Sequence, residues 1–297
     1  MGSLSQWLPA QDKLALSGAS RLRLTNLGVI AGLTGIISGA EVFLFYGHVD
    51  PALWLHAVAL LLCLILPLKL TEQTKICKAF FLLPLFRLVN LGMPIFFNVT
   101  LLWYPIIYGP LIPAGVLIAK DLAVSITAGW RYGILLAPLA IPLSAVMSAI
   151  EFSIITPGAL IPSDSVFEVT LIALVMLLFV GFVEELLYRA ILQRTLTEYL
   201  GFIPALFVAN ALFGLMHSAY GEPLEIVFAG VLGLVYGIFY RYTDSLLYVT
   251  VLHGLLNTFL FGIYPLNSAA FGLPFAGEVV SLEIGRASCR ERVYTKV

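Results

Sequence analysis

Charged side chains are scarce in this sequence, because Asp, Glu, Lys and Arg together make up only 11% of its 297 residues. A soluble globular domain carries about 25% charged residues. Hydrophobic residues make up 60% of the chain, and the mean hydropathy is +1.00. The scarcity of charge excludes an ordinary soluble protein and indicates a polytopic membrane protein.

Cysteine and clustered positive charge are also lacking. The three cysteines, Cys63, Cys77 and Cys289, have neither the spacing of a metal site nor that of a disulfide framework. The formal net charge is -1, and no basic run indicates a nucleic-acid partner. The amino-terminal residues mix polar and apolar side chains, so no cleavable signal peptide is expected. The expected partners are the lipid bilayer and molecules associated with it.

Long apolar segments occupy most of the chain, and a helix needs about 20 such residues to cross a bilayer. The sequence therefore predicts an all-α transmembrane helical bundle of eight or nine spans, roughly at 27–46, 52–70, 79–98, 100–119, 133–150, 167–187, 202–219, 224–240 and 245–263. The pair between 79 and 119 is interrupted by prolines and contains Arg87 and Asn90, which either line a cavity or lie at an interface. Glu41, late in the first span, is expected to extend its carboxylate to the membrane interface.

Lysine and arginine gather on one side of the predicted bundle, where Arg21 and Arg23 precede the first span and Lys75 and Lys78 follow the second. Cytoplasmic loops of membrane proteins carry an excess of these residues. We therefore expect the segment 1–26 to be cytoplasmic. The expected location of the protein is a prokaryotic plasma membrane.

Polar side chains within the predicted spans divide the chain into two regions. Residues 27–150 are expected to form a membrane scaffold, whereas 167–263 hold most of the intramembrane polar groups and are expected to form a catalytic helical core. The segment 283–297 is abruptly basic, and its beginning resembles the translation of a sequencing adapter. We expect this segment to be a non-native tail; a short basic cytoplasmic tail is the alternative.

Glu184, Glu185 and Arg189 interrupt an apolar run that begins near Phe167. A charged side chain at bilayer depth costs about 2.5 to 3.5 kcal/mol, so such residues usually face the bundle interior and carry function. Glu185 and Arg189 are four residues apart and can pair along one helix face. Glu184 points about 100° away from Glu185 and can face a different helix.

Two further polar motifs follow at helical spacing. Phe213 lies one turn before His217 and can pack beneath its ring, while His253 and Asn257 share one helix face. Asn210 is a weaker candidate in the same region.

The turns of the chain predict which of these residues meet. If the helix that carries Glu184 continues to a turn at Gly201, a residue type that suits a helix C-terminus, an antiparallel hairpin places Glu184 level with His217. The same count from a turn at residues 242–244 leaves His253 about two helical turns from the level of His217.

Such a group of side chains supports two kinds of chemistry. Glu184 and His217 can take a proton from water and return it to a leaving amine, while His253 and Asn257 can donate hydrogen bonds to an oxyanion. Alternatively, Glu184, His217 and His253 can supply a zinc site with an open fourth position for water. The sequence leaves both mechanisms open.

The three motifs resemble those of the CPBP family of intramembrane proteases, which includes type II CAAX prenyl endopeptidases and bacteriocin-processing or Abi-like immunity proteins. The family patterns EExxxR, FxxxH and HxxxN match Glu184-Glu185…Arg189, Phe213…His217 and His253…Asn257. The resemblance covers about 167–262. It implies a membrane-embedded catalytic cavity and hydrolysis of a peptide bond in a membrane-associated or lipidated substrate.

By this resemblance, Glu184 and His217 would activate water, and His253 and Asn257 would stabilise the oxyanion or contribute to a metal site. The remaining motif residues would support the site or orient the substrate: Glu185, Arg189 and Phe213. The leading hypothesis is an intramembrane endopeptidase, expected to be a metalloendopeptidase. The alternative is a non-catalytic membrane binding or bacteriocin-immunity protein that uses the same polar cavity.

Overall fold

The computed structural model of the protein describes residues 10–92 and 101–274, with side chains from residue 20 onward. All regular structure in these ranges is helical, so the all-α prediction is confirmed. The segment 283–297 and the end of the span predicted at 79–98 lie outside the described residues.

Seven helices among the described residues are long and apolar enough to cross a membrane, which confirms a polytopic integral membrane protein. They are Ser20–Phe45, Val49–Lys69, Trp130–Ile155, Val166–Leu200, Phe202–Tyr220, Pro223–Thr243 and Leu246–Asn267. The first is part of α1 (Ala10–Phe45), and five of the others contain α2 (Val49–Lys69), α6 (Trp130–Ile155), α10 (Phe202–Leu215), α11 (Pro223–Thr243) and α12 (Leu246–Thr258).

Shorter helices occupy the region of the two proline-interrupted spans. They are α3 (Thr74–Gly92), α4 (Trp103–Tyr108) and α5 (Leu111–Asp121). Proline lacks a backbone N–H and clashes with the preceding turn. Accordingly, Pro110 lies between α4 and α5, at the N-cap of α5.

The helical run that carries Glu184 and Glu185 continues without a break from Val166 to Leu200. It consists of α7 (Val166–Val175), the π-helical segment η4 (Met176–Gly181), α8 (Phe182–Glu185), the π-helical segment η5 (Leu186–Gln193) and α9 (Arg194–Leu200). It ends at Gly201, whose φ of 79° favours glycine, so the predicted turn is confirmed. π-Helical turns often mark functional sites, and two of them flank the carboxylates.

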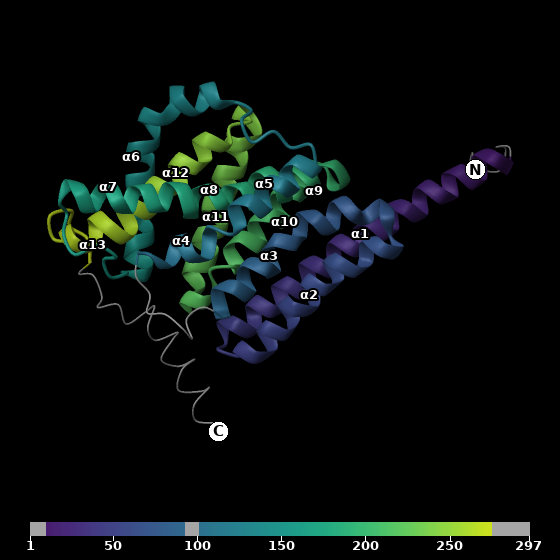
Figure 1. The fold of residues 1–297 in the computed structure, drawn as a ribbon, viewed down its shortest axis with the longest axis horizontal. Helices are drawn as coiled ribbons and strands as arrows, with labels where there is room; N and C mark the ends of the chain where they lie inside the picture. The colour runs from purple at the N-terminus through teal and green to yellow at the C-terminus, as the bar shows by residue number, and fades with distance from the viewer. Residues whose placement is uncertain (1–9, 93–100, 275–297) are drawn as a thin grey trace, which may run out of the picture.

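Helix α12 is the most enclosed span of the bundle. In its apolar window 72% of the residues are buried, against 22% to 50% in the other spans. It packs against α6 and η4. Figure 1 shows α1 and α2 as a long pair beside the rest of the bundle, with the N-terminal part of α1 extending away from it. His253 on α12 is therefore placed in the interior.

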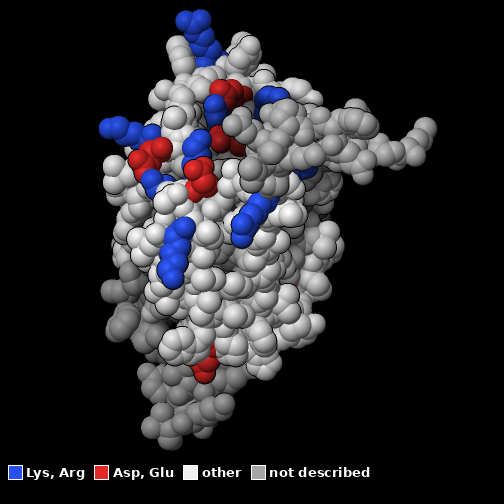
Figure 2. Space-filling view, turned by 90° about the vertical axis from the view of Figure 1, so that its right-hand side faces the viewer, with Lys and Arg blue, Asp and Glu red and all other residues white. Residues whose placement is uncertain are grey.

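Exposed ion pairs join several helix ends: Lys75 with Glu198, Lys78 with Asp121, and Arg194 with Asp244. Figure 2 shows charged side chains gathered towards one end of the visible face, above a broad uncharged surface. This pattern suits a helical bundle that crosses a bilayer. Which end faces the cytoplasm stays a prediction.

Candidate active site

Glu185 and Arg189 form the ion pair expected from their spacing. Arg189 Nε donates to Glu185 Oε2 at 2.9 Å, and both side chains are fully buried. Arg189 also donates to Asn210 Oδ1, and its guanidinium lies 4.8 Å from the centre of the Phe213 ring. Arg189 therefore connects the carboxylate helix to α10 by charge, hydrogen bonding and packing.

The second oxygen of Glu185 contacts α12. His253 Nδ1 lies 2.8 Å from Glu185 Oε1. A β-carbon on Gly181 would lie 2.9 Å from the backbone nitrogen of Gly254 and 2.8 Å from the carbonyl oxygen of Thr250. The missing side chain at Gly181 thus lets the two helix backbones approach closely enough for Glu185 to reach His253.

Glu184 contacts a helix that Glu185 does not, as the angular argument predicted, and among the described residues it shares only His253 with Glu185. The Tyr108 hydroxyl, at the end of α4, donates to Glu184 Oε1 at 2.6 Å. His253 Nε2 lies 3.9 Å from Glu184 Oε2. Sequence reasoning missed Tyr108, because it belongs to no recognised motif and lies in the proline-interrupted region.

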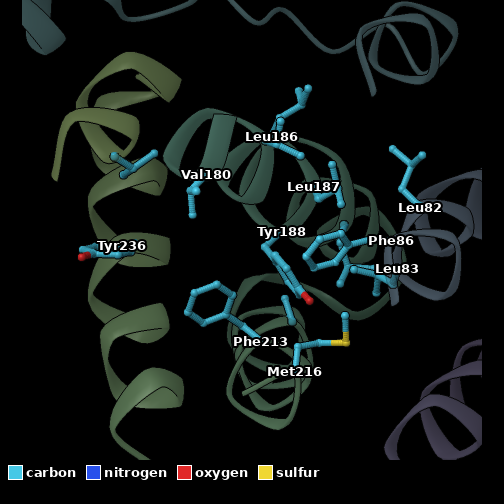
Figure 3. Packing of buried hydrophobic residues seen from close by; sticks show 14 of the residues in the cluster. Leu82, Leu83, Phe86, Val180, Leu186, Leu187, Tyr188, Phe213, Met216 and Tyr236 are labelled. Atoms are coloured by element: carbon cyan, nitrogen blue, oxygen red, sulfur yellow. The ribbon is translucent and has the colours of Figure 1, made fainter. Parts of the chain in front are cut away.

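The predicted hairpin register is confirmed by two aromatic residues. Tyr188 follows Glu184 by four residues and Phe213 precedes His217 by four, so the register places the two rings opposite each other. Their centroids are 4.9 Å apart, and Figure 3 shows Tyr188 beside Phe213 of α10 and Met216, the C-cap of that helix. Glu184 lies within electrostatic range of His217, although the hydrogen bond recorded for Glu184 in the described residues is with Tyr108.

His217 follows the end of α10 and is half-buried. Its Nδ1 lies 3.0 Å from the carbonyl oxygen of Phe213. Since a carbonyl oxygen only accepts, Nδ1 carries a proton, and the lone pair of the neutral ring is on Nε2. The ring contacts Phe213 edge-on at 5.1 Å and stacks on Tyr220 at 6.2 Å. Packing and hydrogen bonding thus fix a ring whose Nε2 can accept a proton.

His253 and Asn257 both lie on the buried face of α12. The ring centroid of His253 is 5.6 Å from that of Tyr236 and 5.9 Å from that of Phe213. Both histidine rings thus contact Phe213, so the offset of about two helical turns expected between His253 and His217 does not separate them. The catalytic roles of these residues stay predictions.

The metal hypothesis finds no matching ligand geometry in the described residues, which contain no group of three or more His, Cys, Asp or Glu side chains arranged to hold a metal ion. In zinc sites, the histidine nitrogen that does not bind the metal commonly contacts a carboxylate or a backbone carbonyl. His253 Nδ1 has such a contact with Glu185, and His217 Nδ1 has one with the Phe213 carbonyl. The same contacts orient an acid or base without metal. Zinc ligation by Glu184, His217 and His253 stays a prediction.

Comparison with known proteins finds one family. Residues 166–259 match the type II CAAX prenyl endopeptidase, Rce1-like, family. The match includes all three polar motifs and confirms the resemblance based on them. No curated protein and no solved structure matches the chain.

Proposed function

We propose, from the match of residues 166–259 to the type II CAAX prenyl endopeptidase, Rce1-like, family, that the protein hydrolyses a peptide bond of a membrane-associated substrate. The observation that carries the proposal is the convergence of three side chains inside the bundle: His217 and His253 both contact Phe213, and Glu184 lies 3.9 Å from His253. Charged groups at this depth are costly and usually functional.

Glu184 and His217 activate the water in this proposal. Their side chains take a proton as the water oxygen forms a bond to the scissile carbonyl carbon, and the carbonyl electron pair moves onto oxygen. When the tetrahedral intermediate collapses, the C–N bond breaks and the proton passes to the leaving amine. His217 suits this role because its Nδ1 contact with the Phe213 carbonyl leaves the Nε2 lone pair free.

His253 and Asn257 stabilise the developing oxyanion. Protonated on both nitrogens, His253 donates Nδ1–H to Glu185 and presents Nε2–H towards the Glu184 side of the site. Asn257, one turn further along α12, supplies an amide donor. Donors held in place before the reaction stabilise the transition state most effectively in a site from which water is excluded.

The substrate in this proposal is a lipidated peptide whose lipid lies in the bilayer. The test uses the full chain in proteoliposomes and a quenched fluorescent peptide ending in a farnesylated Cys-aliphatic-aliphatic-X sequence, with the unlipidated peptide as comparison. Cleavage by the wild type should be lost in Glu184→Gln and His217→Ala and should be faster for the lipidated peptide. Glu198→Gln is the matched control, because Glu198 is half-exposed on the same helical run.

Retained cleavage by purified Glu184→Gln protein would overturn the proposed roles. A binding or immunity protein would be favoured instead by two results together: the wild type cleaves no peptide, and Glu184→Gln leaves the phenotype of cells that carry the protein unchanged.

A further inference from the structure

The chain on both sides of His217 is bonded to the scaffold region of the protein. Before His217, the carbonyl oxygen of Met216 accepts a hydrogen bond from the Arg87 guanidinium. After it, the Ser218 hydroxyl donates to Glu41 Oε2 at 2.6 Å. Arg87 belongs to α3 and Glu41 to α1, so two distant helices meet at the connection that carries His217.

Glu41 and Arg87 are themselves joined by two hydrogen bonds. Arg87 Nε and one terminal nitrogen each lie 2.7 Å from a different Glu41 oxygen, and His56 Nε2 lies 3.1 Å from Glu41 Oε1. All three side chains are buried. The expectation that Glu41 extends to the membrane interface is therefore wrong, because Arg87 on α3 compensates its charge inside the bundle and His56 on α2 contacts it.

This cluster of Glu41, His56 and Arg87 needs an explanation beyond stability. Removing two charges from water is costly, and apolar residues of similar volume often replace a buried ion pair with no loss of stability. A buried ion pair that also forms hydrogen bonds with a particular segment of the chain can instead fix the geometry of that segment. The two bonds made outside the cluster go to the immediate neighbours of His217.

We propose that Glu41 and Arg87 are positioning residues that fix His217 for water activation, an inference that rests on the proposed function. Fixing the backbone at Met216 and the side chain at Ser218 sets the direction in which the intervening residue points. The Nδ1 contact with the Phe213 carbonyl then sets the rotation of the ring. Glu41 and Arg87 touch no substrate in this proposal and act through His217.

Packing between the cluster and the carboxylate helix supports the same arrangement. Tyr188 is buried next to Met216, and Figure 3 shows its hydroxyl pointing into the space between Phe86 and Met216. Tyr188 also lies within electrostatic range of Glu41, Arg87 and Glu184. One aromatic side chain thus fills the space between the scaffold cluster and the proposed site.

The test replaces the pair without leaving an unpaired charge. The double variant Glu41→Leu/Arg87→Met removes both bonds to the neighbours of His217 while keeping apolar volume. We expect the unfolding temperature in detergent to change little, kcat to fall about 10- to 100-fold, as displaced catalytic groups typically cause, and KM to stay unchanged. The pH profile of kcat should also move, because the environment of His217 changes.

Gln193→Met is the matched control. Gln193 Nε2 donates to the Gly237 carbonyl at 3.0 Å, so this variant also removes a buried bond from a side chain to the backbone. The bond lies away from His217, and kcat and its pH profile should match those of the wild type.

Ser218→Ala removes only the hydrogen bond from the Ser218 hydroxyl to Glu41. It replaces the double variant in the test if the double variant does not fold. We expect a smaller fall in kcat with the same displacement of the pH profile. A wild-type kcat and pH profile in the double variant, or in Ser218→Ala if the double variant does not fold, would overturn the positioning role. If these variants have wild-type activity while Glu184→Gln is inactive, the proposed function holds and only the positioning role is wrong. An active Glu184→Gln would instead overturn the role of Glu184 in water activation, and a wild type that cleaves no peptide would overturn the proposed function.

Discussion

His253 Nδ1 lies 2.8 Å from Glu185 Oε1, which joins two motifs that are 68 residues apart in the sequence. The other oxygen of the same carboxylate accepts from Arg189 at 2.9 Å. One buried carboxylate therefore orients the imidazole and compensates the guanidinium. This double role distinguishes Glu185 from Glu184, whose contacts are with the Tyr108 hydroxyl and the far side of His253.

Glu185→Gln should reduce cleavage strongly without removing side-chain volume. The amide oxygen can accept from only one side, so either His253 or Arg189 then faces an N–H₂ group. We expect kcat to fall about 100-fold, as for other displaced catalytic groups, with a smaller change in KM. Steady-state cleavage at a temperature where the variant stays folded measures this effect, and a wild-type kcat would contradict the orienting role.

Arg189→Met should destabilise the protein far more than removing an exposed arginine. The change leaves Glu185 buried without its cationic partner, which typically costs about 3 to 5 kcal/mol. Arg194→Met is the matched control, because Arg194 pairs with Asp244 at the surface and such pairs contribute about 0 to 1 kcal/mol. Reversible unfolding in detergent compares the two, and equal losses would show that burial does not decide the outcome.

Contacts set by helical spacing and by one turn were predictable from the sequence. The Glu185–Arg189 ion pair could be predicted from the four-residue spacing alone. The turn at Gly201 gave the register that brings Tyr188 against Phe213. These contacts lie within one helix or between two helices joined by a short connection, so no knowledge of the wider fold was necessary.

Contacts between elements far apart in the chain were not predictable. Tyr108 reaches Glu184 across 76 residues, and Arg87 reaches Met216 across 129. Which helices pack together is decided by the whole bundle, and neither residue stands in a motif. For Glu41, a carboxylate near the end of a span can face either the interface or the interior, and only its partners decide between the two.

Gly181→Ala should separate the helices that carry Glu185 and His253. The added β-carbon would meet backbone atoms of Thr250 and Gly254 at 2.8 and 2.9 Å, and backbone cannot move aside as a flexible side chain does. We expect a lower unfolding temperature together with reduced kcat. Differential scanning fluorimetry and cleavage kinetics measure the two effects.

Gly35→Ala is the control for Gly181→Ala. A β-carbon at Gly35, on the exposed side of α1, meets nothing within 4 Å. Alanine in a helix is about 1 kcal/mol more favourable than glycine, so this variant should be as stable as the wild type or more stable. Equal damage from both substitutions would contradict the close-approach argument.

Chelation should leave cleavage unchanged if Glu184 and His217 activate water directly. The described residues contain no group of three or more potential ligands arranged around a metal position, and a zinc site needs three protein ligands besides water. The measurement combines metal analysis of the purified protein with cleavage rates before and after chelation. Loss of activity that zinc restores would support the metal site instead.

Tyr108→Phe should alter catalysis while preserving the fold. The ring packs against Phe86 at 5.0 Å, and this packing remains in the variant, but the hydroxyl that donates to Glu184 Oε1 is lost. Because this hydrogen bond fixes the orientation of the carboxylate proposed to activate water, we expect kcat to fall about 10-fold or more. Tyr264→Phe is the matched control, since its hydroxyl donates to the Ala145 carbonyl at 2.7 Å and removing it should leave kcat unchanged. A wild-type kcat in Tyr108→Phe would show that the hydroxyl does not orient Glu184 during the reaction.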